Sequence, residues 1–188
     1  MGKRSDFERK PRDYYPTPIE AVKPLLPHLP EQFDFAEPCA GDARLIEHLE
    51  SNGGACRYAF DIEPMHERVG KQDALEHGYS YCDYIITNPP WNRKILHPMI
   101  EHFVDFKPTW LLFDADWMHT KQSIPYTKYL SKIVSIGRVK WIEGSSSVGK
   151  DNCCWYLFER QAHYPIQFFG KKRKKCLTLF SKQGILIV

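Results

Sequence analysis

The side chains best suited to chemistry lie in the stretch Thr87-Asn88-Pro89-Pro90-Trp91. It follows residues 83–86, whose Asp-Tyr-Ile-Ile sequence predicts a buried strand. Each proline fixes its own φ, lacks an N–H and restricts the residue before it, so the chain must leave the strand as a stiff loop. This loop presents the Asn88 amide, a proline-flanked carbonyl and the Trp91 indole at the carboxyl end of the strand, where open α/β sheets bind ligands.

A turn of mostly small residues, Glu37-Pro38-Cys39-Ala40-Gly41-Asp42-Ala43, connects a first predicted strand at 33–36 to a helix predicted over 44–51. Such a turn lets a ligand approach the backbone amides at a helix N-terminus. Because it contains a single glycine, it is also typical of an ordinary tight strand-to-helix connection.

Two further acids stand where a nucleoside would need them. Asp61 ends a second strand predicted at 56–60, about twenty residues after Gly41, where a carboxylate accepts hydrogen bonds from ribose hydroxyls. Asp73 follows a short helix predicted around 65–70. Its carboxylate either accepts from an adenine amino group or caps a loop.

The remaining pattern predicts the elements that position these residues. An extended, proline-stiffened segment at 13–18 precedes a short helix, and an amphipathic helix and a buried strand follow the Pro-Pro loop. The predicted ranges are helix 19–26, helix 94–106, strand 110–113 and a weakly helical stretch at 125–132. Asp114 and Asp116 follow the strand and either line the same sheet edge or cap the next helix.

The last third of the chain changes character. Residues 133–142 and 152–159 predict two antiparallel strands joined by a flexible loop. Strands alternate with helices before this point and not after it, so we expect an α/β fold, mostly parallel with an antiparallel edge. One domain over 14–160 would then lie between a flexible arm at 1–13 and a basic tail at 161–188.

In this order the motifs resemble the S-adenosylmethionine-dependent N6-adenine methyltransferases, in a compact layout like that of phage-type DNA enzymes. The resemblance covers roughly 13–117 and rests on Tyr15-Pro16-Thr17-Pro18, the 37–43 turn, Asp61-Ile62-Glu63-Pro64, Asp73 and Asn88-Pro89-Pro90-Trp91. It implies a Rossmann-like class I methyltransferase sheet, mostly parallel with an antiparallel final strand. It also implies S-adenosyl-L-methionine as cofactor and adenine in DNA as substrate. Related enzymes that methylate RNA adenines or protein glutamines share a version of the catalytic motif.

The resemblance also implies roles for individual residues. The catalytic set is Asn88, Pro89, Pro90 and Trp91, and the cofactor-binding set is Tyr15, Thr17, Glu37, Cys39, Gly41, Asp61, Ile62, Asp73 and Asn88. Thr17 and the turn would contact the methionine end of the cofactor, Asp61 the ribose and Asp73 the adenine. Ala43 stands where the family often has glycine, and Trp91 replaces the commoner Tyr or Phe.

The chemistry of these residues agrees with that role. The adenine N6 amine is a poor nucleophile because its lone pair is delocalised into the ring. The Asn88 side-chain oxygen and the Pro89 carbonyl would hold both amine hydrogens, which favours a tetrahedral nitrogen and in-line transfer. Trp91 would stack on the extruded base.

Composition narrows the remaining possibilities. No apolar run approaches the ~20 residues of a membrane span, and the charged N-terminus is unlike a secretory signal. Six cysteines without a CxxC motif favour reduced thiols and a cytoplasmic location, and adjacent Cys153 and Cys154 would face opposite ways. The eight histidines show no ligand spacing, so we predict no metal site.

Charge is divided unevenly along the chain. Residues 161–188 hold six basic residues and no acidic ones, so the rest of the +3 chain sums to −3. A basic tail fits a polyanionic partner such as DNA or RNA, or is only a solvated tail. The 144–150 loop suits phosphate contacts or is a plain hairpin tip. Residues 176–188 are apolar enough to add a strand or join a homodimer.

We expect no separate target-recognition domain in the segment after Trp91, because the predicted closing strands occupy most of it. We therefore expect sequence selectivity to be short and to come from loops, from residues 1–13, from the basic tail or from a partner chain. Two other functions stay open: adenine methylation of RNA, and a catalytically silent subunit that binds nucleic acid or a partner.

Overall fold

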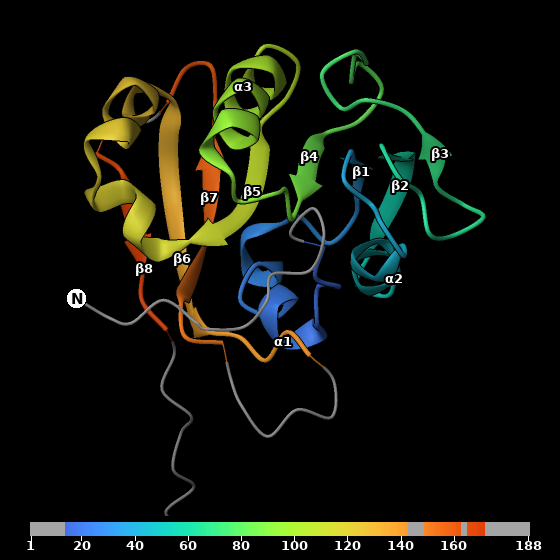
Figure 1. Ribbon diagram of the computed structural model, residues 1–188, viewed down its shortest axis with the longest axis horizontal. Helices are drawn as coiled ribbons and strands as arrows, with labels where there is room; N and C mark the ends of the chain where they lie inside the picture. The colour runs from blue at the N-terminus through green and yellow to red at the C-terminus, as the bar shows by residue number, and fades with distance from the viewer. Residues whose placement is uncertain (1–13, 143–148, 163–164, 172–188) are drawn as a thin grey trace, which may run out of the picture.

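The structure, a computed structural model, describes residues 14–142, 149–162 and 165–171. Its centre is an eight-stranded sheet in the order β3-β2-β1-β4-β5-β7-β6-β8 (Figure 1). The strands are β1 (Phe33–Glu37), β2 (Gly54–Asp61), β3 (Gly70–Lys71), β4 (Tyr84–Thr87), β5 (Thr109–Asp114), β6 (Leu130–Arg138), β7 (Asn152–Phe158) and β8 (Gln167–Phe169). The helices are α1 (Ile19–Val22), α2 (Arg44–Glu50) and α3 (Arg93–Val104), with 3₁₀ segments η2 (Leu26–His28), η3 (Ala115–His119) and η4 (Lys121–Tyr129).

The strand directions confirm the predicted fold class. Strand β7 runs antiparallel to both of its neighbours, β5 and β6, and every other pair in the sheet is parallel. The antiparallel strand lies inside the sheet rather than at its edge, because the short, unpredicted strand β8 and strand β6 lie beyond it.

Two apolar layers hold helices against the two faces of the sheet, as Figure 1 shows for α1 and α2 on one side and α3 on the other. The α3 layer contains Leu96, Ile100 and Phe103, which recur at helical spacing and are fully buried. Cys153 packs in the α1/α2 layer and Cys154 in the α3 layer. The prediction that these neighbours face opposite ways is therefore confirmed.

The helix predicted around 65–70 is wrong. Residues 66–68 form a bend and a turn, and β3 begins at Gly70. Met65 is 63% exposed, and its N–H donates to the Gly41 carbonyl instead of to a helical partner. Val69, four residues on, is buried, so the two apolar residues do not share a buried helical face.

Two other predicted boundaries differ from those in the structure. The helix predicted at 19–26 ends as α1 at Val22, because Pro24 lacks the N–H that a continuing helix would need. Strand β6 begins at Leu130 and ends at Arg138, so the helical prediction for 125–132 holds only as far as the 3₁₀ segment η4. Two register shifts in β6 interrupt the alternation by which a strand is recognised.

Some sequence predictions fall on residues outside the described ranges. These are the 1–13 arm, most of the 144–150 loop, and the tail beyond Lys171. No helix in the described part of the chain is long and apolar enough to cross a bilayer.

Candidate active site

The carboxyl ends of β1, β2, β4 and β5 border one cleft of about 1630 Å³. Strand β7, being antiparallel, brings its first residue, Asn152, to the same cleft. The structure brings together most of the predicted site residues as cleft-lining residues: Tyr15, Thr17, Glu37, Cys39, Asp61, Ile62, Asp73, Asn88, Pro90 and Trp91. Gly41 and Pro89 do not line the cleft, and Pro89 is buried behind it.

The Asn88 amide is oriented by contacts on both of its ends. Its Nδ2 donates to the Tyr15 carbonyl at 3.3 Å and to Thr17 Oγ1 at 3.1 Å. Its Oδ1 accepts from Trp91 Nε1 at 3.4 Å and, as an amide oxygen, has a second lone pair. The extended 14–18 segment therefore fixes which end of the amide is free to accept another donor.

Glu37, at the end of β1, is a buried carboxyl with one unsatisfied oxygen. Oε1 accepts from Thr87 Oγ1 and from the Cys39 N–H, whereas Oε2 has no hydrogen-bond partner among the described residues. Burial raises the pKa of this carboxyl to about 8, although the bonds from Thr87 and Cys39 act against that shift. A cationic group in the cleft would satisfy Oε2.

Asp61 ties the two predicted cofactor loops together. Its Oδ2 accepts from the Gly41 N–H at 2.9 Å, and its Oδ1 accepts from the Glu63 N–H at 2.8 Å. Each carboxylate oxygen can accept a further bond, so both could still receive hydroxyl donors. Asp73 is fixed in a similar way, since its Oδ1 accepts from the Leu75 N–H at 2.9 Å.

The glycine of the turn makes room for a side chain that the sequence analysis did not include. Gly41 has φ +48°, and a Cβ there would lie 2.4 Å from Cε2 of Tyr14, which lines the cleft. Ala43 has φ +65°, so the position where the family often has glycine adopts the conformation that favours glycine. The proline that follows Tyr14-Tyr15 was the available signal for an ordered segment here.

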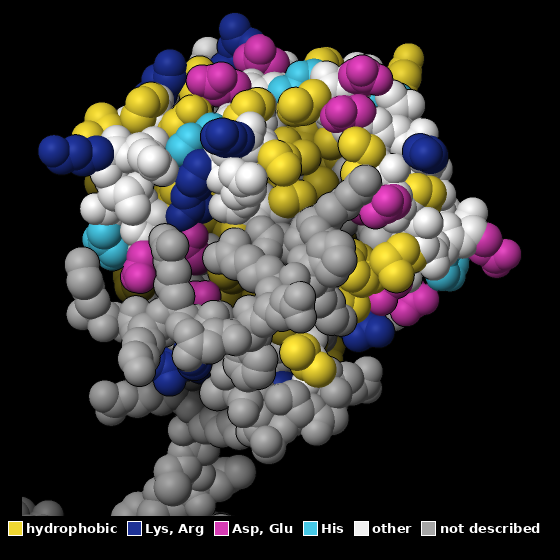
Figure 2. Space-filling view, viewed as in Figure 1, with side chains coloured by type: hydrophobic (Ala, Val, Ile, Leu, Met, Phe, Trp, Pro, Cys, Tyr) yellow, Lys and Arg dark blue, Asp and Glu magenta, His cyan; other side chains and the backbone are white. Residues whose placement is uncertain are grey.

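The cleft combines acidic walls with an apolar mouth. Carboxylates of Asp42, Asp61, Glu63 and Asp73 line it beside Glu37, and Arg93 and Lys94 are the basic residues among its described lining. Four exposed apolar side chains also line it: Ile62, Met65, Leu75 and Ile95. On the face of the molecule drawn in Figure 2, hydrophobic side chains gather between acidic and basic ones. Such a cleft suits a flat apolar ligand that carries positive charge.

Aromatic rings flank the Pro-Pro loop. The Trp91 ring meets that of Trp141 edge to face, with centroids 5.9 Å apart and planes at 80°. The Trp141 ring also lies 6.4 Å from the Tyr15 ring. These half-buried rings leave aromatic surface beside Asn88 on which a planar base could stack.

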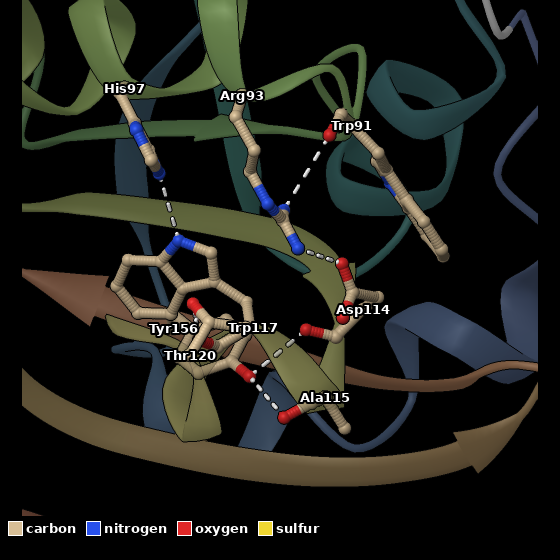
Figure 3. A network of polar contacts seen from close by, with 8 residues as sticks. All are labelled: Trp91, Arg93, His97, Asp114, Ala115, Trp117, Thr120 and Tyr156. Carbon is tan, nitrogen blue, oxygen red and sulfur yellow. Dashed lines mark hydrogen bonds and ion pairs between the residues drawn. The ribbon is translucent and has the colours of Figure 1, made fainter. Parts of the chain in front are cut away.

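Of the two roles predicted for Asp114, the structure does not show the helix cap, because its side chain makes no capping hydrogen bond to η3. Its carboxylate instead forms an ion pair with Arg93, the first residue of α3 (Figure 3). Both residues line the cleft together with Asp116. Arg93 was not among the site residues predicted from the sequence. Its position two residues after Trp91 was the available signal.

No group of three or more His, Cys, Asp or Glu side chains within residues 14–142, 149–162 and 165–171 could hold a metal ion. The cleft thiol of Cys39 has a pKa well above its ordinary value because of burial and the nearby Glu37. It is therefore a poor nucleophile.

Comparisons with known proteins identify the fold. No protein-family model matches the chain, and no curated protein matches its sequence. A protein assigned as an RNA methyltransferase from Pyrococcus horikoshii is similar in structure, with a TM-score of 0.54 and 15% identity, covering 85% of this chain and 93% of that one. A dimethyladenosine transferase from Plasmodium falciparum has a TM-score of 0.51 and 15% identity, covering 77% and 62%.

A third solved structure is a modification subunit assigned to a type I restriction enzyme of Vibrio vulnificus. It has a TM-score of 0.52 and 12% identity, covering 87% of this chain and 48% of that one. At these identities the similarity shows a shared fold. Together with the strand order and the cleft at the carboxyl ends, it shows that the chain has the class I S-adenosylmethionine-dependent methyltransferase fold.

Proposed function

We propose that this protein transfers a methyl group from S-adenosyl-L-methionine to the N6 amine of adenine in DNA. The observation that carries the proposal is the orientation of Asn88, whose amide nitrogen is held by Tyr15 and Thr17. The amide oxygen is thereby available to an exocyclic amine at the cleft, beside the ring of Trp91, which also lines the cleft.

The residues of the cleft fit the cofactor. The unsatisfied Oε2 of Glu37 suits an ammonium group, and the free lone pairs of Asp61 suit ribose hydroxyls. Asp73 and the exposed Ile62 and Leu75 suit the edge and the face of an adenine ring. When bound, S-adenosylmethionine supplies an electrophilic methyl group attached to a sulfonium.

The protein's own residues would position the acceptor amine. Asn88 Oδ1 would accept one of its hydrogens, and Trp91 would stack on the base after it leaves the helix. Pro89, which does not line the cleft, is not placed to accept the second hydrogen. The reaction forms a nitrogen–carbon bond, breaks a carbon–sulfur bond and releases one amine proton. Positioning and electrostatics therefore carry the catalysis, without a strong base.

The second candidate is the same reaction on adenine in RNA. The similarity to the dimethyladenosine transferase and to the RNA methyltransferase supports RNA as the substrate. The similarity to the modification subunit supports DNA. The Thr17-Pro18 element suits either nucleic acid. A silent binding subunit is disfavoured because Asn88, Asp61 and Glu37 all line the cleft.

The test is transfer of tritiated methyl to unmethylated DNA, to RNA and to a protein extract, followed by sequencing of the methylated product. We expect label in DNA adenine and none in protein. If only RNA is labelled, the substrate is RNA and not DNA. If none of the three is labelled although the protein binds the cofactor, the proposal that it is an enzyme is rejected.

Asn88→Ala should abolish transfer because the amine loses an acceptor. The lost bonds to Tyr15 and Thr17 should weaken the affinity for S-adenosylmethionine by no more than about 30-fold, since two neutral hydrogen bonds together contribute about 2 kcal/mol. Asn52→Ala is the matched control, because Asn52 bonds to the His48 carbonyl on the exposed side of α2. Transfer by Asn88→Ala at the wild-type rate would show that the loop has another role.

A further inference from the structure

Arg93 joins three elements through one guanidinium group. Nη2 pairs with the Asp114 carboxylate at the end of β5, and Nη1 donates to the Trp91 carbonyl at 3.5 Å. Arg93 itself begins α3. In Figure 3 its side chain points between these two acceptors, so the end of the Asn88–Trp91 loop, the start of α3 and the end of β5 are linked.

The Asp114 end of this link is rigid. The Tyr156 hydroxyl donates to the main-chain carbonyls of Asp114, at 3.1 Å, and Ala115, at 3.3 Å. Tyr156 is fully buried and stacks on Phe113, with ring centroids 4.3 Å apart. The Arg93 anchor is thus attached to a central strand of the sheet.

The Arg93–Asp114 pair is also withdrawn from water. Its side chains are 25% and 20% exposed, whereas the surface pair Arg57–Asp34 is 53% and 37% exposed. Coulomb attraction is stronger where water is scarce, and removal of one partner leaves an unpaired charge beside the cleft. A surface pair of the Arg57 kind contributes little.

The loop has reason to need such an anchor. Pro89 and Pro90 have no N–H, so the loop cannot hold itself through their backbone. Asn88 ties its first end to the 14–18 segment, and Arg93 contacts its last residue. We infer that Arg93, held by Asp114, is a positioning residue that fixes the Asn88–Trp91 loop in the geometry required for methyl transfer. This inference rests on the proposed function.

A positioning role has a distinct kinetic signature. Arg93 lies on the β4–β5 side of the cleft, whereas the carboxyls that suit the cofactor, Glu37 and Asp61, end β1 and β2. Loss of Arg93 should therefore lower kcat with little change in cofactor affinity. A displacement near 1 Å in a catalytic group lowers the rate by about 100-fold, so we expect kcat to fall about 10- to 100-fold in Arg93→Gln.

The conservative variant separates positioning from charge. Lysine carries one point charge and cannot hold two acceptors in the fixed fork of a guanidinium. Arg93→Lys should therefore keep the pairing with Asp114 and the melting temperature, yet show a kcat clearly below wild type. Asp114→Asn should lower kcat like Arg93→Gln, and the double variant should be no worse than Arg93→Gln alone.

The experiment measures kcat, the dissociation constant for S-adenosylmethionine, and amide hydrogen exchange of the peptide over 87–96. Arg57→Gln is the matched control and should resemble wild type in all three. In Arg93→Gln we expect exchange at Trp91 and Asn92 to rise about tenfold, because a released loop opens more often. The exchange measurement does not depend on activity. If the wild-type protein transfers no methyl group but Arg93→Gln still exchanges faster, the proposed function is rejected and Arg93 remains the anchor of the loop.

Wild-type exchange and kcat in Arg93→Gln would overturn the inference. It would also be overturned if kcat and cofactor affinity fell by the same factor, since Arg93 would then be supporting the whole cleft. If Arg93→Gln does not fold, Arg93→Lys provides the test. A wild-type kcat in Arg93→Lys would show that only the charge pair with Asp114 matters, and would overturn the inference.

Discussion

Glu37 is a buried carboxyl whose charge depends on what occupies the cleft. It is 1% exposed, and burial raises its pKa to about 8. The folded-state pKa therefore lies above the unfolded value of 4.5. Its contribution to stability is fully present below pH 4.5 and is lost as the pH rises through about 8, because ionisation then leaves a buried charge. At pH 6.5 the side chain of the unliganded protein is mostly protonated.

Binding of a cationic cofactor should release that proton. An ammonium group beside Oε2 favours the ionised carboxylate, so at pH 6.5 we expect up to about one proton released for each S-adenosylmethionine bound. Calorimetric titrations in buffers of different ionisation enthalpy measure this number directly. Glu37→Gln keeps the shape and the acceptor for Thr87, and should bind more weakly and release no proton through this group. Equal proton release in both proteins would place the ammonium elsewhere.

The 37–43 turn is the element that joins the cofactor side of the cleft to α2. Gly41 has φ +48°, and its missing Cβ leaves the space occupied by Tyr14. Ala43 has φ +65° and is fully buried, so its methyl group contributes to the core while its backbone is strained. These two effects are each about 1 kcal/mol and opposite in sign, which explains how alanine is tolerated where glycine is usual.

Gly41→Ala should damage this element. The new methyl would combine an unfavourable φ with a clash against the Tyr14 ring, and should lower the free energy of unfolding by about 1–3 kcal/mol. Affinity for S-adenosylmethionine should fall as well, because Tyr14 lines the cleft. Urea unfolding and calorimetry measure the two effects.

Gly170→Ala is the control, since a Cβ there would meet its nearest neighbour, in Phe168, at an ordinary 3.8 Å. A Gly41→Ala protein as stable as this control would mean that Tyr14 moves without cost. The turn would then not depend on the packing that the structure shows.

Local pattern was enough to predict the long buried strands and the amphipathic α3, because burial repeats along each of them. It was not enough for β3 and β8, which are two and three residues long and depend on a neighbouring strand. The Arg93–Asp114 pair escaped prediction for a similar reason: its partners are 21 residues apart and meet only because β4 and β5 end side by side. Conversely, Glu37, Asp61 and Asn88 were found because each follows a predicted strand. Tyr15 and Thr17 follow no strand and were implied by the family resemblance.

On the scale of the whole molecule, charge is separated between an acidic cleft and a basic C-terminal sequence. Among the described residues, eight acidic and two basic side chains line the cleft, and this excess of negative charge suits a cationic cofactor and disfavours phosphates. Residues 161–188 hold six of the basic residues and none of the acidic ones. If this sequence contacts the nucleic-acid backbone, binding must weaken with salt in proportion to the phosphates it neutralises.

Two tail lysines test this division without shortening the chain. In Lys174→Gln/Lys175→Gln, the slope of log K against log salt for binding to duplex DNA should become shallower by about 1.8, since each phosphate contact contributes about 0.9. The matched control, Lys23→Gln/Lys121→Gln, removes the same charge from exposed positions on the body. Because both variants have the same net charge, a difference in slope reports contact rather than overall attraction. A wild-type slope in the tail variant would mean that the tail is merely solvated and that other basic residues carry the phosphate contacts. An equal shallowing in both would show that overall charge, and no local contact, governs binding.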